Sequence, residues 1–308
     1  MNVEATEAAP RSEQPPPDRL ALIVNPSAGG GRAGEALPDV QDALRRLGLE
    51  HRVETTRSLE HARELAQEAF KRGEAAVAFG GDGLVGAVAG ALAHSSGVLG
   101  VLPGGRGNDF ARVLGIPLEP VPACAVLSQG TVRSLDLGDV DGKTFVGIAS
   151  CGFDSEANRI ANEARLIRGN LVYAYAAIRA LSRWRPARFD VRLEGGETHV
   201  VNGYSVGAAN SKAYGGGMYA APDAELDDGQ LDIVTCAEMP KRRFLFSLMP
   251  KVFKGTHTSE PEVTVLRTRE ATISADRAFV MYADGDPIAQ LPVTVRALPG
   301  AVRVIVPR

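Results

Sequence analysis

Hydrophobic and polar positions follow two different spacings in the first half of the chain. Three short, almost wholly apolar runs have the composition of buried strands: residues 20–24, 75–79 and 98–102. Between the first two runs, apolar residues recur at helical spacing over residues 37–47 and 59–70, and Ser58 can cap the second helix. Strands that alternate with helices predict βαβ units, and hence a parallel sheet covered by helices on both faces.

The pattern changes beyond about residue 131, where β-type runs are separated by turn residues. These runs are residues 134–140, 144–149, 189–193, 200–208, 231–235, 262–266 and 278–282. Helical insertions around residues 161–182 and 241–254 interrupt them. Short strands joined by turns predict an antiparallel second domain, which we expect to be a β-sandwich.

Each buried run of the first half leads into a glycine-rich loop. The loops are NPSAGGG at residues 25–31, GGDG at 80–83 and PGGRGND at 103–109. Parallel strands end at one sheet edge, where free backbone N–H groups can bind phosphate. A structural turn explains a single loop equally well, but three at one edge favour a nucleotide site. The acidic Asp82 would repel phosphate, so its role there needs Mg²⁺, a bridging water or a sugar hydroxyl.

Length and charge narrow the class of protein. The 308 residues correspond to about two domains of roughly 150 residues each. With 34 basic and 37 acidic side chains the net charge is −3, which gives no general attraction to nucleic acid or to anionic lipid. We expect no nucleic-acid partner, and a lipid would have to be bound locally.

The composition also points to a reducing compartment. The cysteines Cys124, Cys151 and Cys236 lie far apart without a C-x-x-C pair, which favours neither a disulfide framework nor a zinc site. Residues 1–18 are rich in proline and acids, lack the apolar run of a secretory signal and are expected to form a disordered tail. No run of about 18 apolar residues occurs. We therefore expect a cytoplasmic protein.

Common nucleotide-binding motifs are missing, but five weaker ones occur in a fixed order. There is no G-x-x-x-x-G-K-[ST], no protein-kinase motif set and no G-x-G-x-x-G spacing. Present are V-N-P with its glycine run, GGDG, PGGRGNDFAR, APDAELDDGQLD and DGD. Together they resemble the soluble diacylglycerol kinase catalytic family, which includes the sphingosine and ceramide kinases and bacterial lipid kinases, over nearly all of residues 20–308.

The resemblance implies a division of the chain and a reaction. An α/β ATP-binding domain would occupy residues 19–132, a β-sandwich lipid-substrate domain would occupy residues 133–291, and the last strands, about 292–308, would return to the first domain. The activity would be ATP- and Mg²⁺-dependent phosphorylation of a lipid hydroxyl, with diacylglycerol as the expected substrate. The enzyme would meet its lipid at the inner membrane surface, and the sequence leaves a homodimer open.

The same resemblance assigns a nucleotide site. In the family, the GGDG loop and the loop before N-D-F bind ATP and its metal, and Asn25 and Thr56 match positions that line this site. The loop residues implied are Gly80, Gly81, Asp82, Gly83, Gly107, Asn108 and Asp109. Arg106 stands where the family has threonine and would supply a cationic phosphate ligand.

Two acidic segments of the second half have a simple structural interpretation. Asp-Gly favours tight hairpin turns, so spacing alone favours turns for both the DGD and the DDG segments. By resemblance, Asp284 of DGD is the general base that accepts the proton of the lipid hydroxyl, and Asp286 replaces the family's usual glutamate at the nucleotide. The DDG segment resembles a structural Mg²⁺ site formed by Asp227 and the backbone carbonyls of Gln230 and Asp232. In that case a water network would link the ion to Asp82.

Several positions depart from the family pattern. Leu84, Gly86 and Ala87 follow the GGDG loop where threonine, asparagine and glutamate are common. Two alternatives therefore stay open beside the lipid kinase. One is an NAD kinase-like enzyme, which has a related GGDG loop but is not expected to show N-D-F after P-G-G. The other is a sensor that binds nucleotide or lipid without turnover.

Two segments combine basic and aromatic side chains. Residues 165–188 include Arg165, Arg168, Arg179 and Trp184, and residues 241–254 combine lysines with three phenylalanines. A helix with a solvated basic face explains either segment. A patch that contacts an anionic membrane is the functional interpretation, since a kinase without an anchor must collect its lipid from the bilayer.

Overall fold

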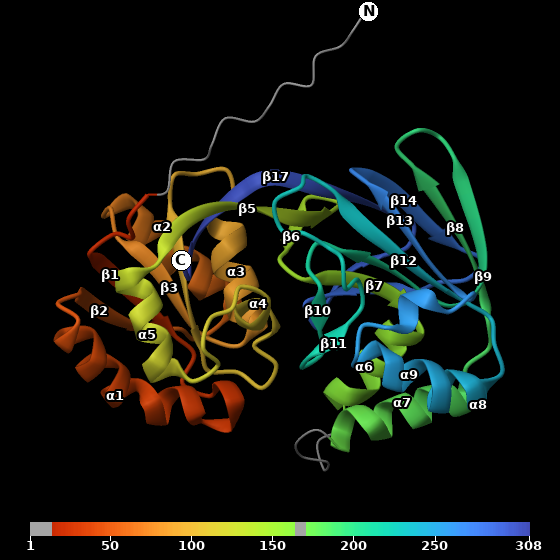
Figure 1. Ribbon diagram of the computed structural model, residues 1–308, viewed down its shortest axis with the longest axis horizontal. Coiled ribbons are helices and arrows are strands. Elements are labelled where there is room, and N and C mark those ends of the chain that lie inside the picture. The colour runs from red at the N-terminus through yellow and green to blue at the C-terminus, as the bar shows by residue number, and fades with distance from the viewer. Residues whose placement is uncertain (1–13, 164–170) are drawn as a thin grey trace, which may run out of the picture.

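The computed structural model describes residues 14–163 and 171–308, which form two halves side by side (Figure 1). The first half contains β1 (Arg19–Val24), η1 (Ala28–Gly30), α1 (Arg32–Arg46), β2 (Glu50–Thr55), α2 (Leu59–Lys71), β3 (Ala75–Gly80), α3 (Asp82–Leu92), β4 (Val98–Pro103), α4 (Asp109–Val113) and α5 (Pro120–Gln129). The first strands of the second half are β5 (Thr131–Val140), β6 (Lys143–Phe145), β7 (Ile148–Gly152), β8 (Ala187–Leu193), β9 (Thr198–Ala209), β10 (Ala213–Tyr214), β11 (Met218–Tyr219) and β12 (Leu231–Ala237). Its last strands are β13 (Val263–Thr268), β14 (Glu270–Ala275), β15 (Val280–Ala283), β16 (Asp286–Gln290) and β17 (Val293–Val306). Its helical elements are α6 (Phe153–Glu163), α7 (Leu171–Arg183), α8 (Lys241–Arg243), the π-turn η2 (Phe244–Leu248), α9 (Met249–Val252) and η3 (His257–Ser259).

The first half is the parallel α/β unit that the sequence predicts. Its strands lie in the order β4-β3-β1-β2, and all three of these pairings are parallel. The three predicted strands are confirmed, and their residues are buried because helices cover the sheet. The edge strand β2 was not predicted, because its EHRVET sequence is half-buried and mostly polar, as an edge position allows.

The second half is antiparallel, as expected for a β-sandwich. Strand β9 lies at its centre and pairs with β7, β8 and β12, while β15 pairs with β7 and β16. All seven predicted runs lie within or overlap strands. Strand β14 was missed although EATISA alternates polar and apolar residues, because two of its three apolar residues are alanines, which are poor strand formers. The predicted fold class is confirmed for both halves.

Two long strands connect the halves. The 14-residue β17 pairs with β14 at its beginning and runs parallel to β4 near its end, and it pairs with β5 along most of its length. Figure 1 shows both strands crossing between the halves. The expected boundary at residue 132 therefore falls inside β5, and the sheet of one half continues into the other.

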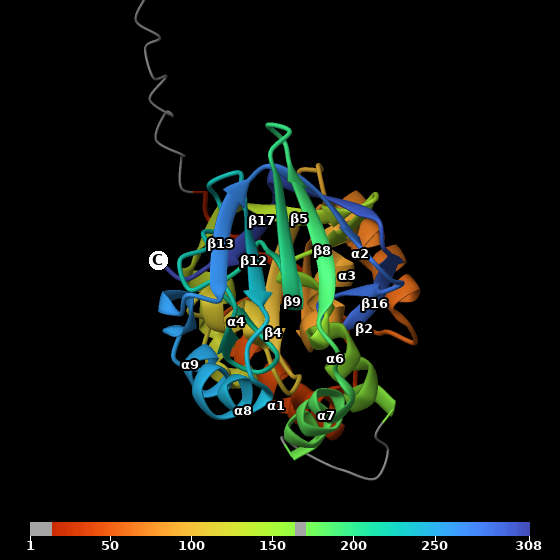
Figure 2. The same cartoon turned by 90° about the vertical axis from the view of Figure 1, so that its right-hand side faces the viewer.

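The helical insertions gather at one end of the second half, where α6, α7, α8 and α9 lie side by side (Figures 1 and 2). The predicted helix at 161–182 is in fact α6 and α7; Arg165 and Arg168 lie outside the described residues. Phe153 anchors α6 through edge-to-face contacts with Trp184, Tyr204 and Phe244. Within the two described ranges, the helices lack the length and apolar content that a membrane crossing requires.

Candidate functional site

The glycine loops meet at the carboxyl edge of the parallel sheet. The N–H of Gly104 donates to the carbonyl of Gly80 over 2.8 Å, so the loops after β4 and β3 touch through their backbones. A Cβ atom on Gly105 would lie 2.4 Å from the Cα of Gly81, and one on Gly29 would lie 2.4 Å from the Gly104 carbonyl oxygen. No side chain fits between these loops, which is why glycine occupies them.

Asn25 and Thr56 lie beside this edge and shape its loops. The Asn25 N–H donates to the carbonyl of Phe79 over 3.1 Å, and its side-chain oxygen accepts from the Ser27 hydroxyl at 2.8 Å. The Thr56 N–H donates to the carbonyl of Val24 over 2.8 Å, and its hydroxyl donates to the Ser58 carbonyl. Both predicted residues thus follow the end of a neighbouring strand, β1 or β2.

Asp82 connects the second glycine loop to the third. Its carboxylate accepts from the N–H of Phe110 at 3.2 Å, and from those of Asn108 and Asp109, at the start of α4. Burial, and next the charge of Asp109, raise the pKa of Asp82 above its usual value. The carboxylate of the GGDG loop is therefore hydrogen-bonded to backbone N–H groups at the start of α4.

The N-D-F loop is held by its own side chains. Asn108 has a left-handed backbone with φ of 52°, and its amide oxygen accepts from the Gly105 N–H at 2.8 Å. Asp109 Oδ2 accepts from the N–H of Gly216 at 2.8 Å and so links this loop to the second half. Arg106 is exposed, and no partner for its side chain occurs within the described residues. Its guanidinium can therefore reach a ligand over Gly107.

Asp284 sits on the tight turn between β15 and β16, where both Asp284 and Gly285 have positive φ, 50° and 93°. Its oxygens accept from the N–H groups of Val146 and Gly147, each at 2.8 Å. Burial is the main cause that raises the pKa of this carboxyl to about 6, and the nearby charge of Asp82 adds to it. The hairpin turn predicted from spacing is present, and it carries a buried carboxyl whose pKa is about 6.

Asn210, which the sequence analysis did not identify, holds the segment that binds Asp284. Its fully buried side chain donates to the carbonyl of Val146 over 3.0 Å and to that of Asp136 over 3.0 Å. Its backbone N–H donates to the Gly147 carbonyl over 2.9 Å. The two N–H groups on Asp284 are therefore fixed by a residue at the end of β9. A lone asparagine after a strand offers no pattern by which to find it.

A cavity of about 170 Å³ brings several of these groups together. Asp82, Gly107, Asp109 and Asp284 line it, and its other walls come from the β6–β7 turn and from β10, β11 and the glycines between them. Asp286 lies beside the first turn of α3, since a Cβ atom on Gly83 would be 3.5 Å from Asp286 Oδ2. Gly86 has no side chain to meet Asp284, whereas Leu84 is buried and packs on Gly80.

A second cavity of about 270 Å³, the apolar chamber, adjoins the first. Both are lined by Asn158, Tyr214, Gly215 and Met218, so the two cavities share a wall. The remaining lining residues of the apolar chamber are Phe153, Asp154, Ala157, Ala176, Ala177, Ile178, Leu245, Met249 and Phe253. Burial raises the pKa of Asp154 in this wall to about 6. Most of the side chains that line the chamber are apolar, and the chamber adjoins the cavity that Asp284 lines.

The three predicted metal-binding residues lie elsewhere. Among the described residues that line the Asp284 cavity, none is Asp227, Gln230 or Asp232. Asp227 Oδ2 accepts from Arg133 at 2.7 Å, and Asp232 Oδ1 lies 3.4 Å from Arg267 Nε. The predicted turn is present, with Gly229 at φ of 73°. A structural Mg²⁺ there would compete with Arg133, and this assignment stays a prediction.

The cavity acids fit the Mg²⁺ that would accompany ATP better. Asp109 Oδ1 is buried without a hydrogen-bond partner in the described structure, and burial raises the pKa of Asp109. Asp82 and Asp284 share that cavity and also have raised pKa values. A divalent cation would offset the repulsion between such carboxylates, but among the described residues they do not form a group of three side chains placed to hold a metal ion, so Mg²⁺ binding here stays a prediction.

Comparisons with known proteins assign the two halves. The family model "Diacylglycerol kinase catalytic domain" matches residues 19–140, and the model "YegS C-terminal NAD kinase beta sandwich-like domain" matches residues 147–306. The first half, with its glycine-loop edge, thus matches a kinase catalytic domain, and the second half matches the β-sandwich-like domain of the same kind of kinase. The chain belongs to the diacylglycerol kinase and YegS-like lipid kinase family, which confirms the resemblance stated from its motifs.

Similar proteins extend over almost the whole chain. A diacylglycerol kinase of Mycobacterium tuberculosis is 35% identical over 298 residues, 94% of this chain and 96% of that protein. A probable YegS-like lipid kinase of Pseudomonas aeruginosa is 32% identical, with 94% and 95% covered. A putative diacylglycerol kinase from Bacillus anthracis has the same fold, with a TM-score of 0.79 at 22% identity and 94% and 97% covered. An NAD kinase from Archaeoglobus fulgidus is a more distant fold relative, with a TM-score of 0.50, 14% identity and 93% of each chain covered.

Proposed function

We propose that this kinase transfers the γ-phosphoryl group of ATP to a lipid hydroxyl, with diacylglycerol as substrate and phosphatidic acid as product. The observation that carries the proposal is the position of Asp284. Its carboxyl lines a cavity that shares a wall with an apolar chamber and is also lined by Asp82, Gly107 and Asp109 of the glycine-loop edge. A lipid tail and a nucleotide phosphate can therefore approach the same carboxyl.

The reaction needs a proton acceptor and charge stabilisation. Asp284 takes the proton of the lipid hydroxyl. The hydroxyl oxygen of the lipid bonds to the γ-phosphorus, and the bond between that phosphorus and the ADP oxygen breaks. Mg²⁺ bound with ATP supplies positive charge for the phosphate oxygens, and Asp82 and Asp109 are the carboxylates that would hold it. Backbone N–H groups of the glycine loops, with the Arg106 guanidinium, position the phosphates.

A transfer assay tests this proposal. Wild-type protein with Mg-ATP is offered diacylglycerol, sphingoid base, ceramide, monoacylglycerol and phosphatidylglycerol in mixed micelles, and NAD in solution. We expect transfer to diacylglycerol, reduced about a thousandfold in Asp284→Asn because the proton acceptor is lost, while ATP binding is retained.

Each other result would replace the proposal. Transfer to NAD alone would support the NAD kinase-like alternative. Tight ATP binding without transfer to any acceptor would support the sensor. An Asp284→Asn variant as active as wild type would remove Asp284 from the role of general base.

A further inference from the structure

The two helical segments beside the apolar chamber carry charge of one sign only. Residues 171–183 and 241–254 contain seven lysines and arginines and no acidic residue: Arg179, Arg183, Lys241, Arg242, Arg243, Lys251 and Lys254. The whole chain, in contrast, has a net charge of −3. Both views of the molecule place α7, α8 and α9 together at one end of the second half (Figures 1 and 2). We call the exposed surface of these two segments the basic-aromatic face.

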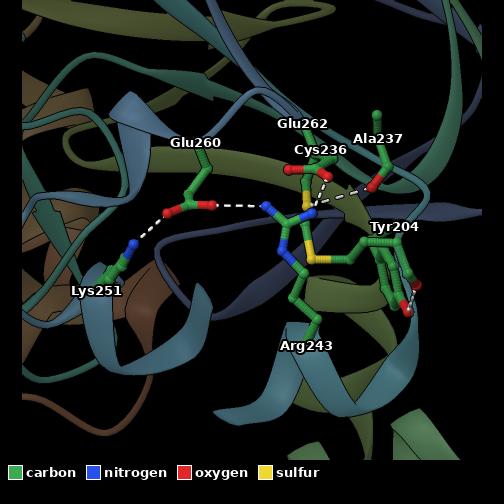
Figure 3. Close-up of polar contacts among 8 residues, drawn as sticks. Tyr204, Cys236, Ala237, Arg243, Lys251, Glu260 and Glu262 are labelled. Atoms are coloured by element: carbon green, nitrogen blue, oxygen red, sulfur yellow. Dashed lines mark hydrogen bonds and ion pairs between the residues drawn. The ribbon is translucent and has the colours of Figure 1, made fainter. Parts of the chain in front are cut away.

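Two of these cations are used to hold the segment in place. Figure 3 shows Arg243 between Glu260 and Glu262, with the Glu260 contact at 2.8 Å, and Lys251 paired with the other oxygen of Glu260. These partners raise the pKa of Arg243 and lower that of Glu260. The pairs fasten residues 241–252 to the start of β13, so their charge is compensated within the fold.

Among the described residues, the remaining cations have no anionic partner. Lys241 donates to the Ser182 carbonyl over 3.1 Å and Arg179 to the Tyr175 hydroxyl over 2.6 Å, and both acceptors are neutral. Arg183, Arg242 and Lys254 are exposed, and within the described ranges their side chains make no polar contact. The basic-aromatic face therefore presents five positive charges that no acidic side chain in the described part of the chain pairs with.

Large apolar side chains stand among these charges. Phe246 is 77% exposed, Ile178 57% and Phe253 55%. Ile178 and Phe253 also line the apolar chamber, so its mouth opens on this face. Exposed apolar groups around a cavity mouth, surrounded by cations, form a surface that water solvates poorly and that an anionic, hydrocarbon-rich partner would cover.

We propose that the basic-aromatic face docks on anionic phospholipid bilayers, so that the apolar chamber opens directly onto the membrane. This inference rests on the proposed lipid-kinase function and identifies the surface through which its substrate enters. A second copy of the chain fits the face less well, because a symmetric contact would bring five like charges against five others. An anionic bilayer satisfies the charges and the phenylalanines together.

Vesicle sedimentation tests the docking without nucleotide or substrate lipid. The probes are phosphatidylcholine vesicles with and without phosphatidylglycerol. We expect binding only when phosphatidylglycerol is present, and weaker binding as salt is raised. The double variant Arg242→Gln with Lys254→Gln should weaken vesicle binding about fivefold for each charge removed. The variant Phe246→Ser should weaken vesicle binding roughly tenfold. Neither Phe246 nor these cations touch the catalytic cavity, so transfer to a monomeric short-chain diacylglycerol should be unchanged.

Matched controls come from the opposite end of the second half. Val200 is 50% exposed on β9, and Arg192 is exposed on β8, so Val200→Ser and Arg192→Gln make the same chemical changes away from the face. Equal loss of binding in controls and test variants, or no vesicle binding by wild type, would overturn the docking surface. Loss of dimerisation instead of vesicle binding in Phe246→Ser would assign the face to a second copy. Failure of the lipid-kinase proposal would appear separately, as vesicle binding without phosphoryl transfer to any lipid.

Discussion

The glycine-loop edge and the apolar chamber both border the cavity that Asp284 lines, but one is formed by backbone and the other by side chains. The edge consists of backbone, with Gly81 and Gly105 so close that no Cβ atom fits between them. The chamber consists of side chains such as Phe153 and Leu245, whose summed volume sets its shape. The edge therefore depends on the absence of a Cβ atom at particular positions. The chamber depends on the summed volume of its side chains. One added methyl group should damage the first much more than the second.

The largest effect is expected from Gly105→Ala. Its Cβ atom would lie 2.4 Å from the Cα of Gly81, so the two loops would have to separate. We expect ATP affinity to fall about a hundredfold, measured by titration calorimetry, because a displacement of this size misplaces the phosphate-binding N–H groups. Gly195→Ala is the control, since nothing lies within 4 Å of its Cβ position. Equal ATP affinity in the two variants would show that this edge is not the nucleotide site.

A smaller effect, confined to turnover, is expected from Asn210→Ala. Without its side-chain amide, the carbonyls of Val146 and Asp136 lose their hydrogen bonds, so the peptide that presents the Val146 N–H to Asp284 is held less firmly, while the backbone contact to Gly147 remains. We expect kcat to fall about tenfold to a hundredfold with ATP affinity unchanged, and the acidic limb of the pH profile to move upward. Asn202→Ala, exposed on the same strand, is the control. A drop in stability with an unaltered kcat and pH profile would make Asn210 a purely structural residue.

The pH dependence of phosphoryl transfer should distinguish the role of Asp284 from that of the glycine-loop edge. Asp284 must be ionised to accept a proton, and its pKa is raised to about 6, so activity is present above that pH and is lost below it. From pH 7 to pH 5 the ionised fraction, and with it kcat/KM for the lipid, should fall about tenfold. ATP binding measured over the same range provides the comparison. A rate that stays constant down to pH 4 would exclude Asp284 as the base.

The smallest effect is expected in the chamber wall, from Asp154→Asn. The folded-state pKa of Asp154 is about 6, above its ordinary 3.8, so ionisation destabilises the fold at pH values above 6 but not below about 4. The amide avoids this cost, and the variant should be more stable than wild type by up to about 3 kcal/mol at pH 8. Urea unfolding at pH 8 and pH 4 measures the difference. Exposed Asp276→Asn serves as the control, and an equal gain in both variants would contradict the assignment.

The sequence predicts the glycine-loop edge much better than it predicts the apolar chamber. Glycines after apolar runs, and a resemblance carried by five motifs, identify the edge and Asp284 because backbone-based sites need particular residues at particular places. The chamber has no such pattern, since Ala177 or Met249 looks like any core residue. Asn210 acts through one buried amide, β2 has a mostly polar sequence, and the apolar residues of β14 are mostly alanine. These features depend on contacts between distant segments, which local spacing does not encode.

The strand β17 also affects how the protein can be synthesised. It follows every other described element, yet Arg303 and Val304 pair with β4 in the first half. During translation, β4 would emerge from the ribosome long before this neighbour exists, and its edge would stay unpaired while the whole second half is made. An unpaired buried strand is prone to association with other chains. The first half would therefore depend on chaperones, or on slow translation, until its last strand arrives.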